Sequence, residues 1–336
     1  MNNGYQTIIE TGGSDPQWDD FLSSLEYFHH EQSTCWANVK QHQGWQAVRL
    51  KVVKGSEWLS GAQMLCKKLP VGGSIGYISS GPFYRIRNDQ SIDVLVHSIN
   101  QFAKEKRIQY VAITPYVENA YLDNVLENNG YRLTEERLPP KSTARATLIL
   151  DLSKEPDRLL MEMRRETRRE IKLALKAGLT VREGERKDLD TLFRLMTVVA
   201  ERRGEKPIPK SVDIFNAIWD SFHPRGYVKL LIVESGSEPI STGFIFTFGN
   251  TVRFWKYGWS GEEQKKYPNQ LLYWELIKWS KDHGFRYFDI VQVDSAITDH
   301  LSQGLPVTDE LKSRPLYGPT LYKMGFGGTV VKFSGP

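Results

Sequence analysis

Residues 55–60 read Gly-Ser-Glu-Trp-Leu-Ser, and residues 236–241 read Gly-Ser-Glu-Pro-Ile-Ser. Each copy is followed by the same order of expected elements: two strands, a turn, a helix and a further strand. The last strand reads Q-Y-V-A-I-T-P after the first copy and R-Y-F-D-I-V-Q after the second. Two similar β-turns could arise by chance, but the shared order indicates duplication of a whole domain rather than a solenoid.

The length of the chain fits this interpretation, because 336 residues are enough for two hydrophobic cores. We expect one domain in residues 1–150 and a second in residues 151–327, with a C-terminal strand at 328–336 as a candidate to complete the first. Strands followed by a helix and a strand are the order of acetyltransferase-like folds, among others. The predicted fold class is therefore α/β, with two tandem acetyltransferase-like (GNAT) domains related by internal duplication.

Hydrophobic periodicity assigns the remaining elements. It predicts strands at residues 45–54, 59–67, 74–80, 108–113, 143–152, 227–234, 240–248, 251–257 and 287–293. It predicts helices at residues 93–105, 119–129, 188–202, 211–222 and 268–283, and one long helix that begins near Pro156 and ends near Gly178.

Composition limits the classes of function. The net charge of +4 does not by itself demand a nucleic-acid partner, so that inference must rest on local basic clusters. Cys35 and Cys66 lack CxxC spacing, and His29 and His30 are the only adjacent histidines, so we expect no disulfide framework and no metal site. The sequence has no secretory pattern at its start and no apolar run long enough for a membrane span. We therefore expect a cytoplasmic protein without an integral membrane segment.

Several short motifs resemble one protein family when they are taken in order. They are Q-S-T-C-W-A-N-V-K at 32–40, S-S-G-P at 79–82, M-R-R-E-T-R-R-E-I-K-L-A-L-K-A-G at 163–178, A-E-R-R-G at 200–204, Y-G-W-S at 257–260 and L-Y-K-M-G-F-G-G at 321–328. Together they resemble the Fem family of peptidoglycan-bridge aminoacyltransferases. The resemblance extends over most of the chain, and the ordered set is more specific than any single motif.

The resemblance implies an enzyme that moves an amino acid from aminoacyl-tRNA to the amino group of a peptidoglycan-precursor peptide, forming an amide bond. Larger members carry a long helical hairpin, for which the interval between 178 and 200 is too short, so the chain resembles the compact, armless type. The segment Phe288–Val291 lacks the double glycine of the family, and the sequence ends at Pro336, soon after the last strand. An acceptor that is instead a related peptide-like small molecule would fit both departures.

The helix at 163–178 is the candidate tRNA-binding element. Its cations are Arg164, Arg165, Arg168, Arg169, Lys172 and Lys176, against two glutamates. Arg165, Arg169, Lys172 and Lys176 share one helical face, as contacts along a phosphate backbone require. A solvated face with Glu–Arg pairs is the alternative interpretation.

Four residues are candidates for binding the acceptor. In the resemblance, Lys40 matches a lysine that contacts the diphosphate of a nucleotide-sugar precursor, and Lys210 falls near an arginine with the same role. Tyr257, at a strand end, matches a residue that lines the acceptor groove, and we group Tyr322 with it. Each could instead be an ordinary surface lysine or core aromatic.

Lys323 is the principal catalytic candidate, because the family places the matching lysine near the reacting ester. A cation there would stabilise the negative charge that develops on the attacked carbonyl oxygen. Gly327 and Gly328, which follow it, permit positive φ angles or close backbone approach. Asp289, at the end of an apolar strand, could accept a proton from the attacking ammonium, or could simply cap a turn or pair with a cation.

An acyl-CoA-dependent N-acyltransferase of the same fold is the rival interpretation. Such enzymes hold the pyrophosphate in a glycine-rich loop at the start of a helix. The corresponding segments here, residues 83–90 and 264–269, contain no glycine. Since an aminoacyl ester is already activated, we expect the reaction to need no cofactor and no covalent enzyme intermediate.

Overall fold

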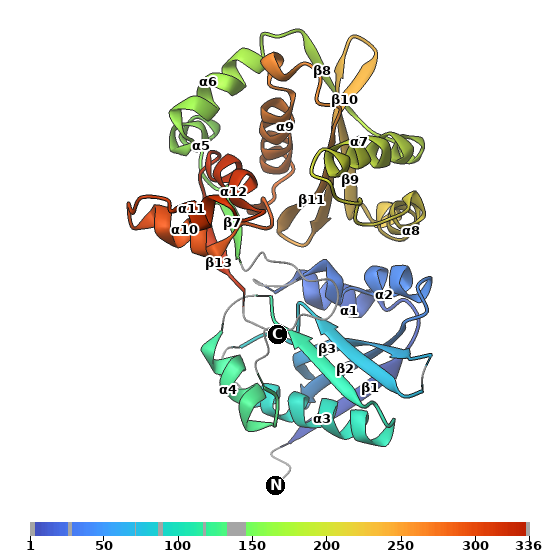
Figure 1. The fold of residues 1–336 in the computed structure, drawn as a ribbon. Helices are drawn as coiled ribbons and strands as arrows, with labels where there is room; N and C mark the ends of the chain where they lie inside the picture. The colour runs from blue at the N-terminus through green and yellow to red at the C-terminus, as the bar shows by residue number, and fades with distance from the viewer. Residues whose placement is uncertain are drawn as a thin grey trace. The chain divides into compact units, whose positions relative to one another are not determined.

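The computed structural model describes residues 4–25, 29–70, 72–86, 90–116, 119–132 and 146–333. The chain divides into two compact units, residues 1–142 with 332–336 and residues 143–331 (Figure 1). This division falls before the expected boundary at residue 150, because residues 146–151 form a strand in the sheet of the second unit. Residues 143–145 of the strand expected there lie outside the described residues.

The first unit contains a mixed sheet in which neighbouring strands follow the order β1-β2-β3-β4-β6, with β5 paired to β3. Its strands are β1 (Tyr5–Thr11), β2 (Gln46–Lys54), β3 (Glu57–Lys68), β4 (Ser74–Ser79), β5 (Phe83–Tyr84) and β6 (Tyr110–Thr114). Its helices are α1 (Pro16–Ser23), η1 (His30–Gln32), α2 (Thr34–Gln41), α3 (Ser91–Glu105) and α4 (Ala120–Asn128). Strands β1 to β4 pair antiparallel, whereas β4 and β6 pair parallel because α3 returns the chain between them.

The core of the first unit lies between the sheet and one face of α3. Apolar side chains recur on that face at helical spacing, at Ile92, Leu95, Val96, Ile99 and Phe102, and all are buried. They pack with inward-facing residues of β2 and β3 and with the buried face of α4. The core therefore uses period 3.6 on the helices and period 2 on the strands, as the sequence patterns predict.

The second unit contains a sheet of order β13-β7-β12-β11-β10-β9-β8. Its strands are β7 (Ala146–Asp151), β8 (Leu179–Glu183), β9 (Val228–Ser235), β10 (Glu238–Phe248), β11 (Thr251–Trp259), β12 (Tyr287–Asp289) and β13 (Thr329–Lys332). Its helices are α5 (Pro156–Glu162), α6 (Arg165–Ala174), η2 (Arg186–Asp188), α7 (Leu189–Glu201), α8 (Val212–Phe222), η3 (His223–Arg225), η4 (Gln264–Lys266), α9 (Pro268–Asp282), α10 (Ser295–Ser302), α11 (Asp309–Lys312) and α12 (Tyr317–Met324).

The two sheets share one connectivity. Strands β8, β9, β10, β11 and β12 repeat the order and directions of β1, β2, β3, β4 and β6. Two helices separate the first two strands of each set, and α9 corresponds to α3 before the parallel strand. The repeated sequence forms the same turn in both units, because Gly55 and Gly236 adopt φ angles of 62° and 64°. This shared topology confirms the duplicated α/β fold.

Helices cover both faces of the second sheet, with α9 on one face and α7 on the other (Figure 1). Glycines on β10 and β11 show how closely these two helices pack against the sheet. A Cβ on Gly258 would meet Leu195 of α7 at 2.6 Å, and one on Gly243 would meet Leu276 of α9 at 3.0 Å. Larger side chains at these two positions would therefore push the helices away from the sheet.

Two expectations for the second unit differ from the structure, and several elements were not predicted. The long helix expected up to Gly178 is broken at Met163 and Arg164, which have extended ψ angles of 155° and 149°. Arg168 Nη1 holds the break by donating to Met161 O and Met163 O, at 2.7 and 3.1 Å. The C-terminal strand pairs with β7 in the second sheet rather than completing the first sheet. Strands β1 and β8 and helices α1, α2 and α10–α12 were not expected from the sequence.

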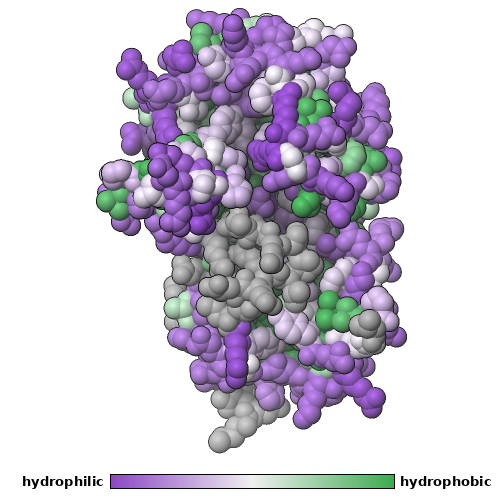
Figure 2. Space-filling view, in the orientation of Figure 1, coloured by the Kyte–Doolittle hydropathy of each residue, from purple (hydrophilic) through white to green (hydrophobic). Residues whose placement is uncertain are grey.

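The face that Figure 2 shows carries isolated apolar side chains. The visible face of both units is mainly hydrophilic, with scattered hydrophobic residues (Figure 2). No helix in this part of the chain combines the length and the apolar composition that a membrane crossing would require.

Candidate active site

Strands β11 and β12 of the second unit separate after a short stretch of pairing. They pair parallel only over residues 251–253 and 287–289, and β11 then continues to Trp259 with β10 as its neighbour on the other side. Since β12 ends at Asp289, no described strand pairs with β11 on this side over residues 254–259. The residues at this opening come from β11, from the segment after β12 and from α12.

The segment after β12 forms a bulge against β7. Ile290 N donates to Leu148 O and Val293 N donates to Ala146 O, both at 2.9 Å. Two residues of this segment, 291 and 292, therefore oppose one residue of β7. Val291 and Gln292 have φ angles of 49° and 50°, a conformation that is especially rare for a β-branched residue.

Asp289 holds this bulge in place. Its Oδ1 accepts a hydrogen bond from Val291 N at 2.8 Å and another from the Thr147 hydroxyl. Its Oδ2 pairs with Arg253 Nη2 at 3.2 Å, and the Asp289 side chain is 0% exposed. A carboxylate so enclosed and engaged cannot accept a proton from a substrate without losing these contacts. The structure thus gives Asp289 a positioning role, which is the turn-capping, ion-paired alternative noted above.

Lys323 lies on α12, directly over the bulge. Its Nζ donates to Val291 O at 2.7 Å and to Gln292 O at 2.9 Å. The helix is fixed on the same segment by Thr320 Oγ1, which accepts from Asp294 N at 3.0 Å. The strained bulge therefore directs two carbonyl groups at the ammonium and sets its position.

A cluster of cations surrounds this position, and we call Lys323, Lys256 and Arg203 the cationic cluster. The Lys323 side chain is partly exposed, but its ammonium is enclosed by protein, and this burial lowers its pKa to about 7. Asp289 opposes the shift, whereas Arg203 and Lys256 add to it. Burial also lowers the pKa of Lys256, to about 8. Such concentrated positive charge suits a site where negative charge develops.

Tyrosines line the side of the site next to α9. Tyr273 and Tyr322 meet edge to face with ring centroids 5.6 Å apart, and Tyr257 packs against the same core. Arg203 Nη2 donates to the Tyr257 hydroxyl at 3.2 Å, which connects these rings to the cationic cluster. Burial raises the pKa of Tyr322 well above its usual value, and smaller contributions come from Tyr273, Tyr257 and Glu170.

Helix α6 carries the cations expected to contact tRNA, and the structure divides them into two sets. Arg165, Arg169, Lys172 and Lys176 are exposed, with Lys176 just beyond the end of the helix. Arg168 is partly buried and caps the end of α5, as described above, so its guanidinium is engaged within the protein. The first four remain available to a polyanion, whereas Arg168 has a structural role.

Lys40 lies on α2 in the first unit. Its Nζ sits 4.9 Å from the centroid of the Trp36 ring and donates to Gln43 Oε1 at 3.2 Å. Burial lowers the pKa of Lys40, Glu31 opposes this shift, and Lys67 adds to it. Lys210 belongs to the second unit, where it is exposed in the segment before α8.

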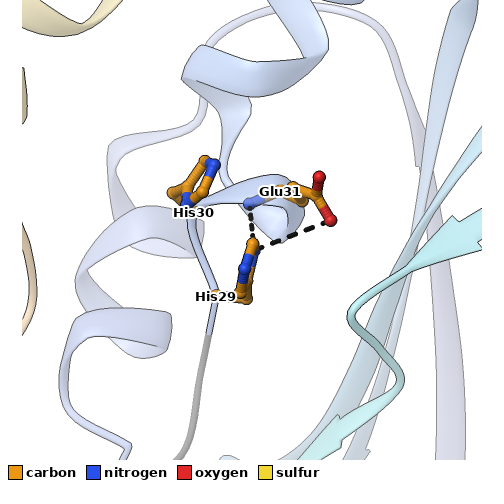
Figure 3. Close-up of side chains that lie close together, drawn as sticks. All are labelled: His29, His30 and Glu31. Atoms are coloured by element: carbon orange, nitrogen blue, oxygen red, sulfur yellow. Dashed lines mark hydrogen bonds and ion pairs between the residues drawn. The ribbon is translucent and has the colours of Figure 1, made fainter. Parts of the chain in front are cut away.

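His29, His30 and Glu31 bring three potential metal-ligand atoms within 4.8 Å of one another (Figure 3). Two of these side chains already have hydrogen bonds. His29 Nδ1 accepts from Glu31 N at 3.2 Å, and Glu31 Oε2 accepts from the hydroxyls of Ser79 and Ser80. A metal ion would have to displace these contacts. We therefore interpret the cluster as structural: Glu31, which directly precedes the motif at 32–40, bonds to Ser79 and Ser80 of the motif at 79–82. Glu31 also supplies the negative charge near Lys40.

The segment before α9 is where an acyl-CoA enzyme of this fold would hold its pyrophosphate. Here Lys266 Nζ pairs with Glu263 Oε1 at 2.8 Å, and Tyr267, the residue that caps α9, has a φ angle of 55°. A bulky residue and an internal ion pair thus stand where close backbone approach would be needed. In the first unit, residues 87–89 of the corresponding segment lie outside the described residues.

The sequence pattern did not single out several residues of this site. Arg203 lies within the motif A-E-R-R-G and Lys256 directly precedes the motif Y-G-W-S, so a search for cations in and beside those motifs would have found them. The bulge at Val291 and Gln292 had no such signal, because neither residue type favours positive φ.

Comparison with known proteins agrees with this architecture. A model of the FemAB family matches residues 14–235. The lipid II:glycine glycyltransferase of Staphylococcus aureus is 31% identical over 227 residues, which are 64% of this chain and 52% of that protein. The chain thus spans about half the length of the curated relatives it matches.

Two solved structures share the fold. A crystal structure of FemX superposes with a TM-score of 0.83 at 21% identity, covering 97% of this chain and 95% of that one. A tandem GNAT protein from the clavulanic acid biosynthesis pathway gives a TM-score of 0.52 at 10% identity, covering 89% and 94%. Both support the expected tandem acetyltransferase-like fold. Because the family model matches more than half of the sequence, the chain belongs to the FemAB family.

Proposed function

We propose that this protein is an aminoacyltransferase that moves an amino acid from aminoacyl-tRNA to the amino group of a peptidoglycan-precursor peptide or a related peptide-like molecule. The observation that carries the proposal is the placement of Lys323 by the bulge, at the opening between β11 and β12, within a cationic cluster. Membership of the FemAB family and similarity to a lipid II:glycine glycyltransferase support the same class of reaction.

The hydrogen bonds of Lys323 define its chemistry. An ammonium has three N–H donors, and two are used by Val291 O and Gln292 O. The third is left for a substrate oxygen, so the charged form can stabilise the oxyanion formed when an amine attacks the ester carbonyl. Collapse of that intermediate breaks the ester bond, the departing tRNA oxygen takes up the proton that the attacking nitrogen loses, and the amide remains.

The exposed face of α6 supports the choice of donor. Arg165, Arg169 and Lys172 lie on a helix whose opposite face is buried through Thr167, Ile171 and Ala174, and Lys176 follows just beyond its end. A rigid row of cations at helical spacing suits a phosphate backbone, and the segment before α9 is unsuited to CoA. An aminoacyl-tRNA donor would place the reaction in the cytoplasm. The acceptor would be an amine-bearing peptide or nucleotide-sugar peptide, with Lys210 and Tyr257 as proposed contacts in the second unit and Lys40 as a separate candidate in the first.

The test is a transfer assay with a mixture of charged tRNAs and candidate acceptors, one a lipid-linked and one a nucleotide-linked precursor peptide, read by mass spectrometry. We expect an acceptor whose mass rises by one amino-acid residue, and we expect ribonuclease added beforehand to abolish the product. Parallel reactions contain acetyl-CoA in place of tRNA. Transfer that survives ribonuclease, or turnover with acetyl-CoA alone, would contradict the proposal.

A further inference from the structure

The Tyr322 hydroxyl has no hydrogen-bond partner among the described residues, although its oxygen is shielded from solvent. A buried polar group without a partner costs stability, so its persistence calls for an explanation. The phenol is fixed by its neighbours: Tyr273 lies edge to face at 5.6 Å and Phe326 at 5.4 Å, measured between ring centroids. The hydroxyl is thus held in a fixed position where no described protein group forms a hydrogen bond with it.

An acidic group faces the same place. Glu170 of α6 is half-buried, and its Oε2 accepts from Gln270 Nε2 of α9 at 3.0 Å. Burial is the largest cause of the raised pKa of Tyr322, followed by Tyr273 and Tyr257, and the negative charge of Glu170 raises it further. Gln270 and Tyr273 lie three residues apart on α9 and share a face of it, so the Glu170 carboxylate lies on the side of α9 that carries the Tyr273 ring. A carboxylate near aromatic rings and an unpaired phenolic oxygen suits an organic ammonium group, because ring faces and oxygens present negative charge.

We propose that Tyr322 and Glu170, together with the rings of Tyr257 and Tyr273, form a binding site for a primary ammonium group. In the proposed function, on which this assignment rests, the ligand is the α-ammonium of the aminoacyl donor. The attacking amine of the acceptor must lose its proton, whereas the donor's amine can stay charged, so a site that stabilises an ammonium suits the donor.

The position of the site matches the shape of an aminoacyl ester. In such an ester a single carbon separates the α-ammonium from the carbonyl. Arg203 donates to the Tyr257 hydroxyl and its charge also acts on Lys323, so the tyrosines adjoin the cationic cluster. One part of the site therefore attracts a cation and the adjoining part attracts an anion, in the order that the ester requires.

The first experiment measures binding without catalysis. Glycinamide carries an ammonium, and glycolamide replaces it with a neutral hydroxyl of similar size. We expect glycinamide to bind at least tenfold more tightly in ligand-observed NMR titrations at pH 6.5. Glu170→Gln and Tyr322→Phe should each reduce this ratio severalfold, whereas Glu166→Gln, on the exposed face of the same helix, should preserve it. Equal binding of the two amides, or a ratio unchanged in both variants, would overturn the assignment.

The second experiment separates this inference from the proposed function. Transfer from glycyl-tRNA is compared with transfer from glycolyl-tRNA in the wild type and in Glu170→Gln. We expect the preference for glycyl-tRNA to fall at least tenfold in the variant. If neither donor supports transfer but the amides are still distinguished, the proposed function fails and the ammonium site stands. If transfer proceeds with an unchanged preference, the ammonium site fails and the proposed function stands.

Discussion

The protonation state of Lys323 decides how the site works, and its pH dependence can be calculated. Because burial lowers the pKa of Lys323 to about 7, the ammonium fraction is about 0.9 at pH 6 and about 0.1 at pH 8. If the charged form stabilises the oxyanion, the contribution of Lys323 should fall about tenfold for each pH unit above 7. Lys323→Met, which removes the charge, should lower the chemical rate by about 10² to 10³ at pH 6.

The assay is the single-turnover rate of wild type and of Lys323→Arg between pH 5.5 and 9. Arginine stays charged over this range, whereas the acceptor amine titrates equally in both proteins. The wild-type rate divided by the rate of Lys323→Arg therefore isolates the effect of Lys323. We expect this ratio to be flat below pH 6 and to fall above pH 7. A neutral Lys323 would still donate to both carbonyls but would offer a lone pair to the attacking amine. In that case the ratio would rise with pH, and the oxyanion role would be refuted.

Three further predictions follow from the geometry. Alanine at Arg165, Arg169 and Lys172 together should weaken tRNA binding and lower the log–log salt slope by about 0.7 to 0.9 per lost phosphate contact, as filter binding at several salt concentrations can measure; an unchanged slope would mean a solvated face. Asp289→Asn leaves a buried arginine without its ion-pair partner, so urea unfolding should show a loss of about 3 to 5 kcal/mol, and a loss below 1 kcal/mol would contradict the positioning role. The folded protein binds its Lys323 proton less tightly than the unfolded chain does, so wild-type stability should rise from pH 7 towards pH 10. Lys323→Met should show a smaller rise in thermal denaturation, because among the described lysines only Lys256 and Lys40, whose pKa values are also lowered, still contribute to it. Equal pH profiles for the two proteins would refute the contribution of Lys323.

Local sequence signals predicted the repeated scaffold well. The two Gly-Ser-Glu turns and the periodicity of α3 are both properties of short segments, and each segment folds as its own pattern requires. The exposed row at Arg165, Arg169 and Lys172 was also visible, because residues three and four apart share a face on any helix.

The features that escaped prediction depend on contacts between distant segments. The helix break at Met163 has no proline or glycine to announce it, and the hydrophobic spacing continues across it. It is held instead by Arg168 and by the hydrogen bond from Arg164 N to Gly325 O. The bulge at Val291 likewise depends on Asp289, whose carboxylate could be assigned to this backbone only once the fold was known. Site geometry of this kind is set by tertiary structure.

Comparison of the duplicated sheets explains why the chemistry is placed in the second unit. In the first unit, β4 and β6 pair along five residues, from Ile75 with Tyr110 to Ser79 with Thr114, so this part of the sheet stays closed. In the second unit, the equivalent strands pair along only three residues before the bulge directs the chain away. The bulge is held by β7, a strand at a position where the first sheet has no described counterpart. Opening the sheet exposes one side of β11 and at the same time aims two carbonyls at Lys323. In the proposed function, the same deviation from the repeated fold thus opens one side of β11 towards a substrate and positions the Lys323 ammonium that would act on it.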